Sequence, residues 1–67
     1  MKITYFRDTD MLSIQLRDVP STESEEVAPG FVFDFGVDGA VVALEIEHAS
    51  HHVDIRGVTV QALDVLS

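Results

Sequence analysis

Two histidines are the side chains whose type and spacing come closest to a metal site. His48 and His52 are four positions apart, so on a helix they would share one face, as in a two-histidine metal site. The zinc-protease pattern also needs a glutamate directly after the first histidine, and Ala49 stands there instead. Solvent-exposed histidines on a short helix are therefore the favoured interpretation. A metal site formed by His48 and His52 is the less favoured one.

Two carboxylates, Asp34 and Glu45, are expected on the same face of a β-hairpin, diagonally across from each other. Residues in that relation lie about 7–8 Å apart, a separation compatible with the acid and base of a glycosidase. A flat sheet face lacks the water-excluding pocket that raises a catalytic pKa. The sequence therefore favours a solvated polar face. Three further aspartates are best explained as turn residues: Asp8, Asp10 and Asp38.

No other pattern supports an enzyme. The chain has no cysteine, its serines lack the glycine context of a nucleophile elbow, and its four glycines form no phosphate-binding loop. We therefore expect neither catalytic residues nor a cofactor.

The charge balance makes two kinds of partner improbable. Twelve acidic residues against four scattered basic ones give a net charge of −8. Binding to nucleic acid or to anionic lipid needs clustered lysine and arginine, so neither is expected. The acidic excess most simply keeps a small domain soluble, and it also permits a basic protein partner. Because the sequence shows neither a membrane-spanning apolar run nor a signal peptide, we expect a cytoplasmic protein without membrane contact.

The segment from Phe31 to Glu47 organises the predicted fold. It reads as a β-hairpin with a two-residue type I′ turn at Asp38-Gly39, a pair that suits such a turn. That turn sets three large apolar pairs on one face: Phe35 with Val42, Phe33 with Leu44, and Phe31 with Ile46. We expect this face to form the core.

The rest of the chain supplies further strands and a short helix. Ile3–Phe6 and Met11–Arg17 alternate in polarity and predict a first hairpin that pairs Tyr5 with Leu12. The acidic segment Glu23–Val27 suits an edge strand, since charge there discourages unwanted pairing. Glu47–Val53 reads as one or two helical turns. The prediction is an α+β, mainly β fold: an antiparallel meander of two hairpins, with four to five strands and a short helix near Glu47–Val53.

The domain organisation follows from length. A chain of 67 residues predicts a single small domain spanning 1–67, near the size at which one core is marginal. Residues 54–67 read as a C-terminal tail that suits either strand or helix. A meander has one apolar face that must be covered, by the tail, by a second copy or by another protein. We therefore expect a homo-oligomer, most simply a dimer, or a complex with a partner.

The chain resembles the bacterial domain-of-unknown-function family number 2283. The resemblance covers roughly Lys2–Val53 and lies in an ordered set of short matches: Lys2-Ile3-Thr4-Tyr5, Asp8, Asp10, Leu12-Ser13-Ile14-Gln15-Leu16, Glu25-Glu26-Val27, Pro29-Gly30, Val32-Phe33-Asp34-Phe35, Asp38-Gly39, Leu44-Glu45-Ile46 and Ala49-Ser50. Gly36-Val37 departs from the polar residues more usual before the second turn. The resemblance implies a small bacterial sheet-plus-helix protein and no catalytic residue. Some members resemble the antitoxin half of two-gene modules whose partner looks like a small ribonuclease-type toxin.

Three functions stay open at this point. The favoured one is a non-enzymatic protein-interaction domain, antitoxin-like in that it would bind a small basic protein. The alternatives are a self-associating structural domain and a small metal-binding or hydrolytic protein. The candidate interaction residues are the acidic segment and two apolar tail residues: Glu23, Glu25, Glu26, Leu63 and Leu66.

Overall fold

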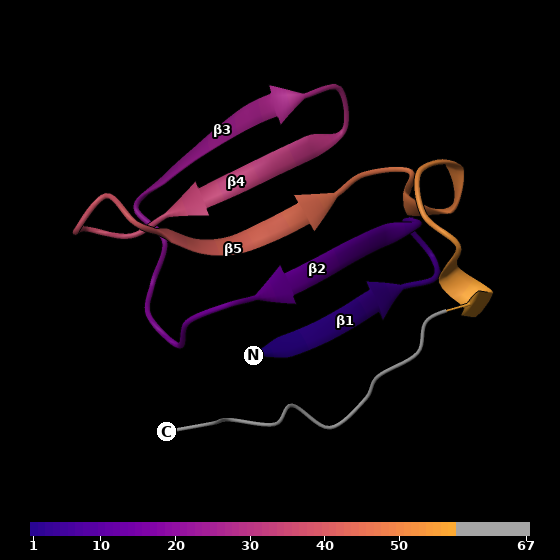
Figure 1. Ribbon diagram of the computed structural model, residues 1–67, viewed down its shortest axis with the longest axis horizontal. Coiled ribbons are helices and arrows are strands. Elements are labelled where there is room, and N and C mark those ends of the chain that lie inside the picture. Colours follow the sequence, from indigo (N-terminus) through magenta and orange to yellow (C-terminus); the bar gives the residue numbers. More distant parts are fainter. Residues whose placement is uncertain (58–67) are drawn as a thin grey trace, which may run out of the picture.

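Five antiparallel strands form a single sheet in the computed structural model, which describes residues 1–57 (Figure 1). The strands are β1 (Lys2–Phe6), β2 (Met11–Gln15), β3 (Glu23–Ala28), β4 (Phe31–Phe35) and β5 (Val41–Ile46). Two short 3-10 turns follow, η1 (Ala49–His51) and η2 (Ile55–Gly57). The predicted mainly β fold with two hairpins is confirmed, and the acidic segment is an edge strand. The short helix is a 3-10 turn, and residues 1–57 contain no α-helix.

The strand order is β1-β2-β5-β4-β3, so the two hairpins meet through β2 and β5. After β2 the chain crosses the end of the sheet and begins again at its far edge with β3 (Figure 1). The strands β3, β4 and β5 then return toward the middle as consecutive antiparallel neighbours. Among residues 1–57, the edges of the sheet are therefore β1 and β3. No helix in the described part of the chain is long and apolar enough to cross a membrane.

Register gives the sheet one apolar and one more polar face. Residues directly opposite each other in an antiparallel pair share a face. One face therefore carries two apolar rows that cross four strands, Ile3–Ile14–Leu44–Phe33 and Tyr5–Leu12–Ile46–Phe31. We call it the apolar face. The opposite, polar face carries Ser13 beside Glu45, and Ala43 beside Asp34.

The predicted type I′ turn at Asp38-Gly39 is wrong. Only Gly39 of this pair has a positive φ, at 80°. The Gly39 N–H donates to the Gly36 carbonyl at 2.9 Å, and the Gly36 N–H donates to the Ala40 carbonyl at 2.9 Å. This pattern is a three-residue loop in which a type I turn is followed by a left-handed glycine. An Asp-Gly pair suits both turn types, so local sequence did not separate them.

The hairpin register is confirmed for two of the three predicted pairs. Phe31 lies opposite Ile46 and Phe33 opposite Leu44, as expected. Phe35 lies opposite Val41 instead of Val42, because the register shifts between Asp34 and Phe35. The three-residue loop displaces the pairing by one position. Val42, the extra residue of a bulge in β5, restores the predicted register beyond it.

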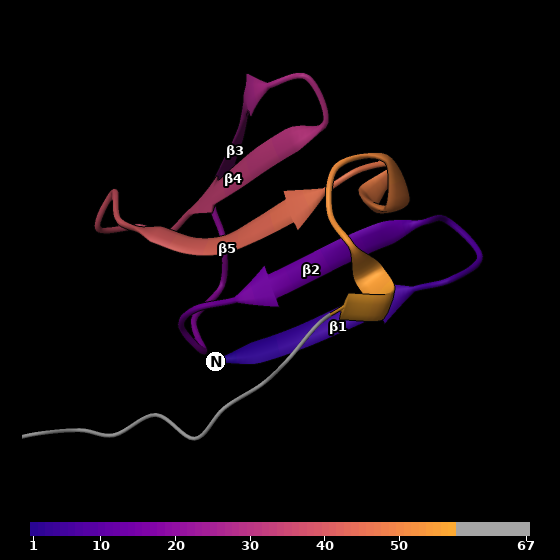
Figure 2. The ribbon, with the colours of Figure 1, turned by 45° about the vertical axis from the view of Figure 1, so that its right-hand side comes forward.

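The core lies at two places. At one end of the apolar face, Ala49 of η1 is fully buried against Leu12 and Ile46, and Tyr5, Phe31, Val53 and Ile55 pack around them. Figure 2 shows the segment after β5 folded back over the ends of β2 and β1. At the other end of the sheet Val42 is 2% exposed. Phe33 and Phe35, expected in the core, are only half-buried.

Candidate functional site

The two histidines flank η1 and do not share a helix face. His48 precedes the turn with a left-handed backbone, φ 51°, and His52 follows it. The His52 ring packs edge-on against Phe31, with ring centroids 4.9 Å apart. The His48 ring lies nearer to His51, at 6.2 Å. No group of three or more potential ligand side chains forms among residues 1–57. His48 and His52 therefore lack the shared helix face on which the less favoured metal-site interpretation depended.

The carboxylates Asp34 and Glu45 lie diagonally across β4 and β5, as predicted, because Asp34 faces Ala43 and Glu45 faces Val32. The expectation that both are solvated is wrong for Asp34, which is 7% exposed. Its Oδ1 accepts a 2.6 Å hydrogen bond from the hydroxyl of Ser24 on β3. Pairing with the edge strand covers this carboxylate, which the sequence of the hairpin alone does not reveal.

The pair perturbs the pKa of Glu45, but only Asp34 lines the hollow beside it. Burial raises the pKa of Glu45, and the neighbouring Asp34 raises it further through its charge and a hydrogen bond. A shallow hollow of about 200 Å³ opens beside Asp34, lined also by Ser13, Gln15 and Ser21. Glu45 does not line this hollow, so the two carboxylates do not flank a common substrate space. Asp34 instead ties β4 to β3 through Ser24.

Asp10 has a structural role that its turn position did not indicate. With φ 55° it occupies a left-handed position, and its carboxylate accepts hydrogen bonds from the Tyr5 hydroxyl at 2.7 Å and the Ser50 hydroxyl at 2.6 Å. The Ser50 N–H also donates to the Asp10 carboxylate at 3.1 Å, and the Ala49 N–H donates to the backbone carbonyl of Asp10 at 2.8 Å. The Ser50 hydroxyl, followed by that of Tyr5, lowers the pKa of Asp10. Asp10 therefore fastens η1 to the first hairpin.

A broad cleft lies beside this network and is the largest described, at about 660 Å³. Its walls include Tyr5, Ser50 and Val53, with Arg7 and Arg56 also lining it. Both hydroxyl groups that line the cleft donate their protons to Asp10.

The acidic edge strand β3 is the most exposed element of the sheet, with all six residues exposed. Glu23 lies opposite Phe35 and Glu25 opposite Phe33, so both glutamates project from the apolar face beside phenylalanines. Glu26 lies opposite Val32, on the polar face. The structure thus brings the three predicted interaction glutamates together on one edge. The predicted anchors Leu63 and Leu66 lie outside the described residues.

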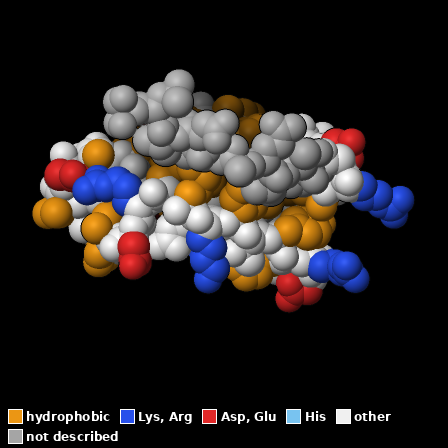
Figure 3. Space-filling model, turned by 60° about the horizontal axis from the view of Figure 1, so that its bottom comes forward, with side chains coloured by type: hydrophobic (Ala, Val, Ile, Leu, Met, Phe, Trp, Pro, Cys, Tyr) orange, Lys and Arg blue, Asp and Glu red, His pale blue; other side chains and the backbone are white. Residues whose placement is uncertain are grey.

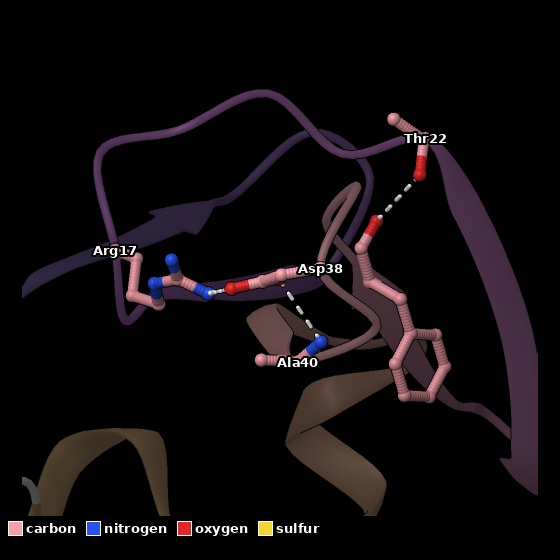
Figure 4. A network of polar contacts seen from close by, with 5 residues as sticks. Arg17, Thr22, Asp38 and Ala40 are labelled. Carbon is pink, nitrogen blue, oxygen red and sulfur yellow. Dashed lines mark hydrogen bonds and ion pairs between the residues drawn. The ribbon is translucent and has the colours of Figure 1, made fainter.

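Ion pairing does not neutralise these glutamates within residues 1–57. The one salt bridge there joins Arg17, after β2, to Asp38 in the β4–β5 loop, at 3.0 Å (Figure 4). The same region holds the start of β3 in place, because the Thr22 hydroxyl and N–H both donate to the Phe35 carbonyl. The β3 edge is therefore anchored at its beginning while its acidic side chains face solvent.

Comparison with known proteins gives one match. No curated protein and no solved structure is significantly similar to the chain. A family model described as "Protein of unknown function (DUF2283)" matches residues 2–50, which comprise β1 to β5 and the first residues of η1. Because this match covers most of the chain, the protein is a member of the DUF2283 family.

Proposed function

We propose that this chain is a non-enzymatic protein-interaction domain whose acidic edge strand β3 binds a small basic protein. The observation that supports it best is the arrangement of three exposed glutamates on one edge strand, two of them beside half-buried phenylalanines. We call this surface the β3 surface and define it by Glu23, Glu25, Glu26, Phe33 and Phe35.

The β3 surface combines two kinds of contact that act at different stages of binding. Exposed charges steer an oppositely charged partner and increase its association rate. Aromatic side chains that lose water contact at the centre of an interface slow dissociation instead. Glu23 and Glu25 stand next to Phe35 and Phe33 in the register, so a cationic segment that also carries apolar residues fits both.

The partner class follows from charge and from family resemblance. A net charge of −8 favours a basic partner and disfavours nucleic acid. The resemblance noted above implies a small ribonuclease-type toxin encoded by a neighbouring gene. Neutralisation of such a protein would need binding alone, which agrees with a sheet whose described clefts offer no reactive pair.

The experiment measures binding of the purified product of a neighbouring gene that encodes a short basic protein. The test variant is Glu23→Lys/Glu25→Lys/Glu26→Lys. The matched control is Asp8→Lys/Asp18→Lys/Glu47→Lys, which changes the net charge equally at exposed positions outside β3. We expect the test variant to lose most of its association rate at low salt, and the control to lose much less.

A second variant, Phe33→Leu, separates the apolar contribution from charge. It should raise the dissociation rate with little change in salt dependence. Equal effects of the test and control charge reversals would show that only net charge matters, and would contradict a β3 surface. Unchanged binding by all three variants, or no binding by wild type, would also contradict the proposal.

A further inference from the structure

The two edges of the sheet differ in the features that prevent edge-to-edge pairing. Edge strands are commonly protected by charged side chains, prolines and bulges. β3 carries three glutamates, has a register shift between Glu26 and Ala28, and is followed by Pro29. β1 has no carboxylate and no proline, its one charged residue is Lys2 at its first position, and its register with β2 is unbroken over five pairs. Among residues 1–57, β1 is therefore the less protected edge.

β1 also exposes a large apolar side chain on each face. Ile3, on the apolar face opposite Ile14, is 48% exposed. Phe6, on the other face opposite Met11, is 41% exposed. Figure 3, which turns the lower side of Figure 1 forward, shows hydrophobic side chains among the described atoms that are visible on that side. Both faces of the sheet thus end at β1 in apolar residues that another strand would cover.

From these observations we infer that β1 pairs antiparallel with β1 of a second copy, which joins the two sheets across a two-fold axis. Five strands from each copy give one continuous sheet of ten. Isologous pairing of this kind closes as a dimer and leaves no free β1 edge. β3 does not serve this purpose, because pairing it with itself would set its glutamates against those of the second copy.

The faces of the sheet restrict the register. The apolar face continues across the joint only if Ile3 and Tyr5 meet residues of the same face. The register that pairs all five residues of β1 places Thr4 opposite the partner's Thr4. Ile3 then faces the partner's Tyr5, and Lys2 faces the partner's Phe6, a cation–aromatic contact. The two lysines lie at opposite ends of the joint, so no like charges meet.

Thr4 provides a specific test because it would face itself across the axis. Its half-buried side chain lies on the polar face, opposite Ser13. Thr4→Glu and Thr4→Lys should each weaken the dimer about a hundred-fold or more through like-charge juxtaposition. An equimolar mixture of the two should dimerise again, because each glutamate then faces a lysine. The controls are Ser21→Glu and Ser21→Lys, at an exposed position before β3.

Sedimentation velocity at micromolar concentration measures each species, and circular dichroism shows whether each variant is folded. An isotope-filtered nuclear Overhauser experiment on mixed-labelled wild type detects the contact of Ile3 with the partner's Tyr5 without any substitution. We expect a wild-type dimer with this contact, monomeric single variants and a restored mixed dimer. A folded wild-type monomer would overturn the inference and assign the edge to another occupant, such as residues 58–67. A dimer without the contact, or folded variants whose mixture stays monomeric, would also overturn it.

Discussion

A close contact between Gly36 and Val42 makes a quantitative prediction about the bulge in β5. A Cβ built on Gly36 would lie 3.0 Å from Val42 Cγ1 and 3.3 Å from Asp38 Oδ1. Gly36 is buried and Val42 is 2% exposed, so neither residue has room to move outward. Gly36→Ala should therefore overpack this end of the sheet, at a cost of about 1–3 kcal/mol of unfolding free energy.

Val42→Ala should destabilise by the opposite mechanism, because it removes two buried carbon atoms. Each contributes about 0.8 kcal/mol of transfer free energy, and the remaining cavity adds to the loss, so the total is about 2 kcal/mol. The same substitution removes the Cγ1 atom that an alanine at position 36 would strike. The double variant Gly36→Ala/Val42→Ala should therefore be more stable than the sum of the single effects indicates, by about 1 kcal/mol. The Asp38 contact persists in the double variant, so the relief is partial.

Urea denaturation of the four proteins at one fixed protein concentration measures this coupling. Val27→Ala, at a 47% exposed position on β3, is the matched control for loss of the same side chain. Combined with Gly36→Ala, it should give additive changes. If the changes in unfolding free energy caused by Gly36→Ala and Val42→Ala also add within about 0.3 kcal/mol in their double variant, the close contact between the two residues is refuted, and with it the buried bulge.

Two further predictions concern the turn and the carboxylate pair. Gly39 has φ 80° and no atom lies near the position that its Cβ would take, so a substitution there should cost only backbone strain. Gly39→Val should therefore lower the melting temperature much more than Gly39→Asn, because asparagine tolerates a left-handed backbone. Equal melting temperatures of the two variants would contradict the left-handed conformation of Gly39. Burial and Asp34 raise the pKa of Glu45 above its unfolded value of 4.5, so its stabilising contribution is complete below that pH and is lost as pH rises through the folded pKa. Glu45→Gln should therefore raise the melting temperature at neutral pH and not in acid, and a pH profile parallel to that of wild type would contradict the raised pKa.

The strands and most of their register could be predicted because alternating polarity has the period of a β-strand. The pairing of Phe31 with Ile46 and of Phe33 with Leu44 could be predicted, because a slip of one residue would move these side chains to the other face of the sheet. The turn could not be predicted in the same way. The three-residue loop shifts the pairing of β4 with β5 by one residue, and the bulge at Val42 shifts it back. The pairs from Asp34–Ala43 onward are therefore the same as those that a two-residue turn would give, and these pairs do not reveal the turn type.

The features that were missed depend on residues distant in sequence. Asp10 and Ser50 are 40 positions apart, and no local pattern indicates that a turn aspartate holds a 3-10 turn in place. The burial of Asp34 depends likewise on pairing with Ser24 of the edge strand. The acidic edge itself was predictable, because a run of glutamates between loop residues fits an edge strand better than a central one.

The two proposed interfaces use opposite edges of the sheet, so both can be occupied at the same time. Within residues 1–57 the buried apolar side chains are few: Leu12, Val42, Ile46 and Ala49. A single sheet with so small a core gains stability from any surface that covers its remaining apolar residues. Pairing through β1 would extend the apolar face and place the two β3 strands at the outer ends of the joined sheet. Each copy would then present its own acidic edge, and a dimer would bind two basic partners or bind one bivalent partner with a higher effective concentration.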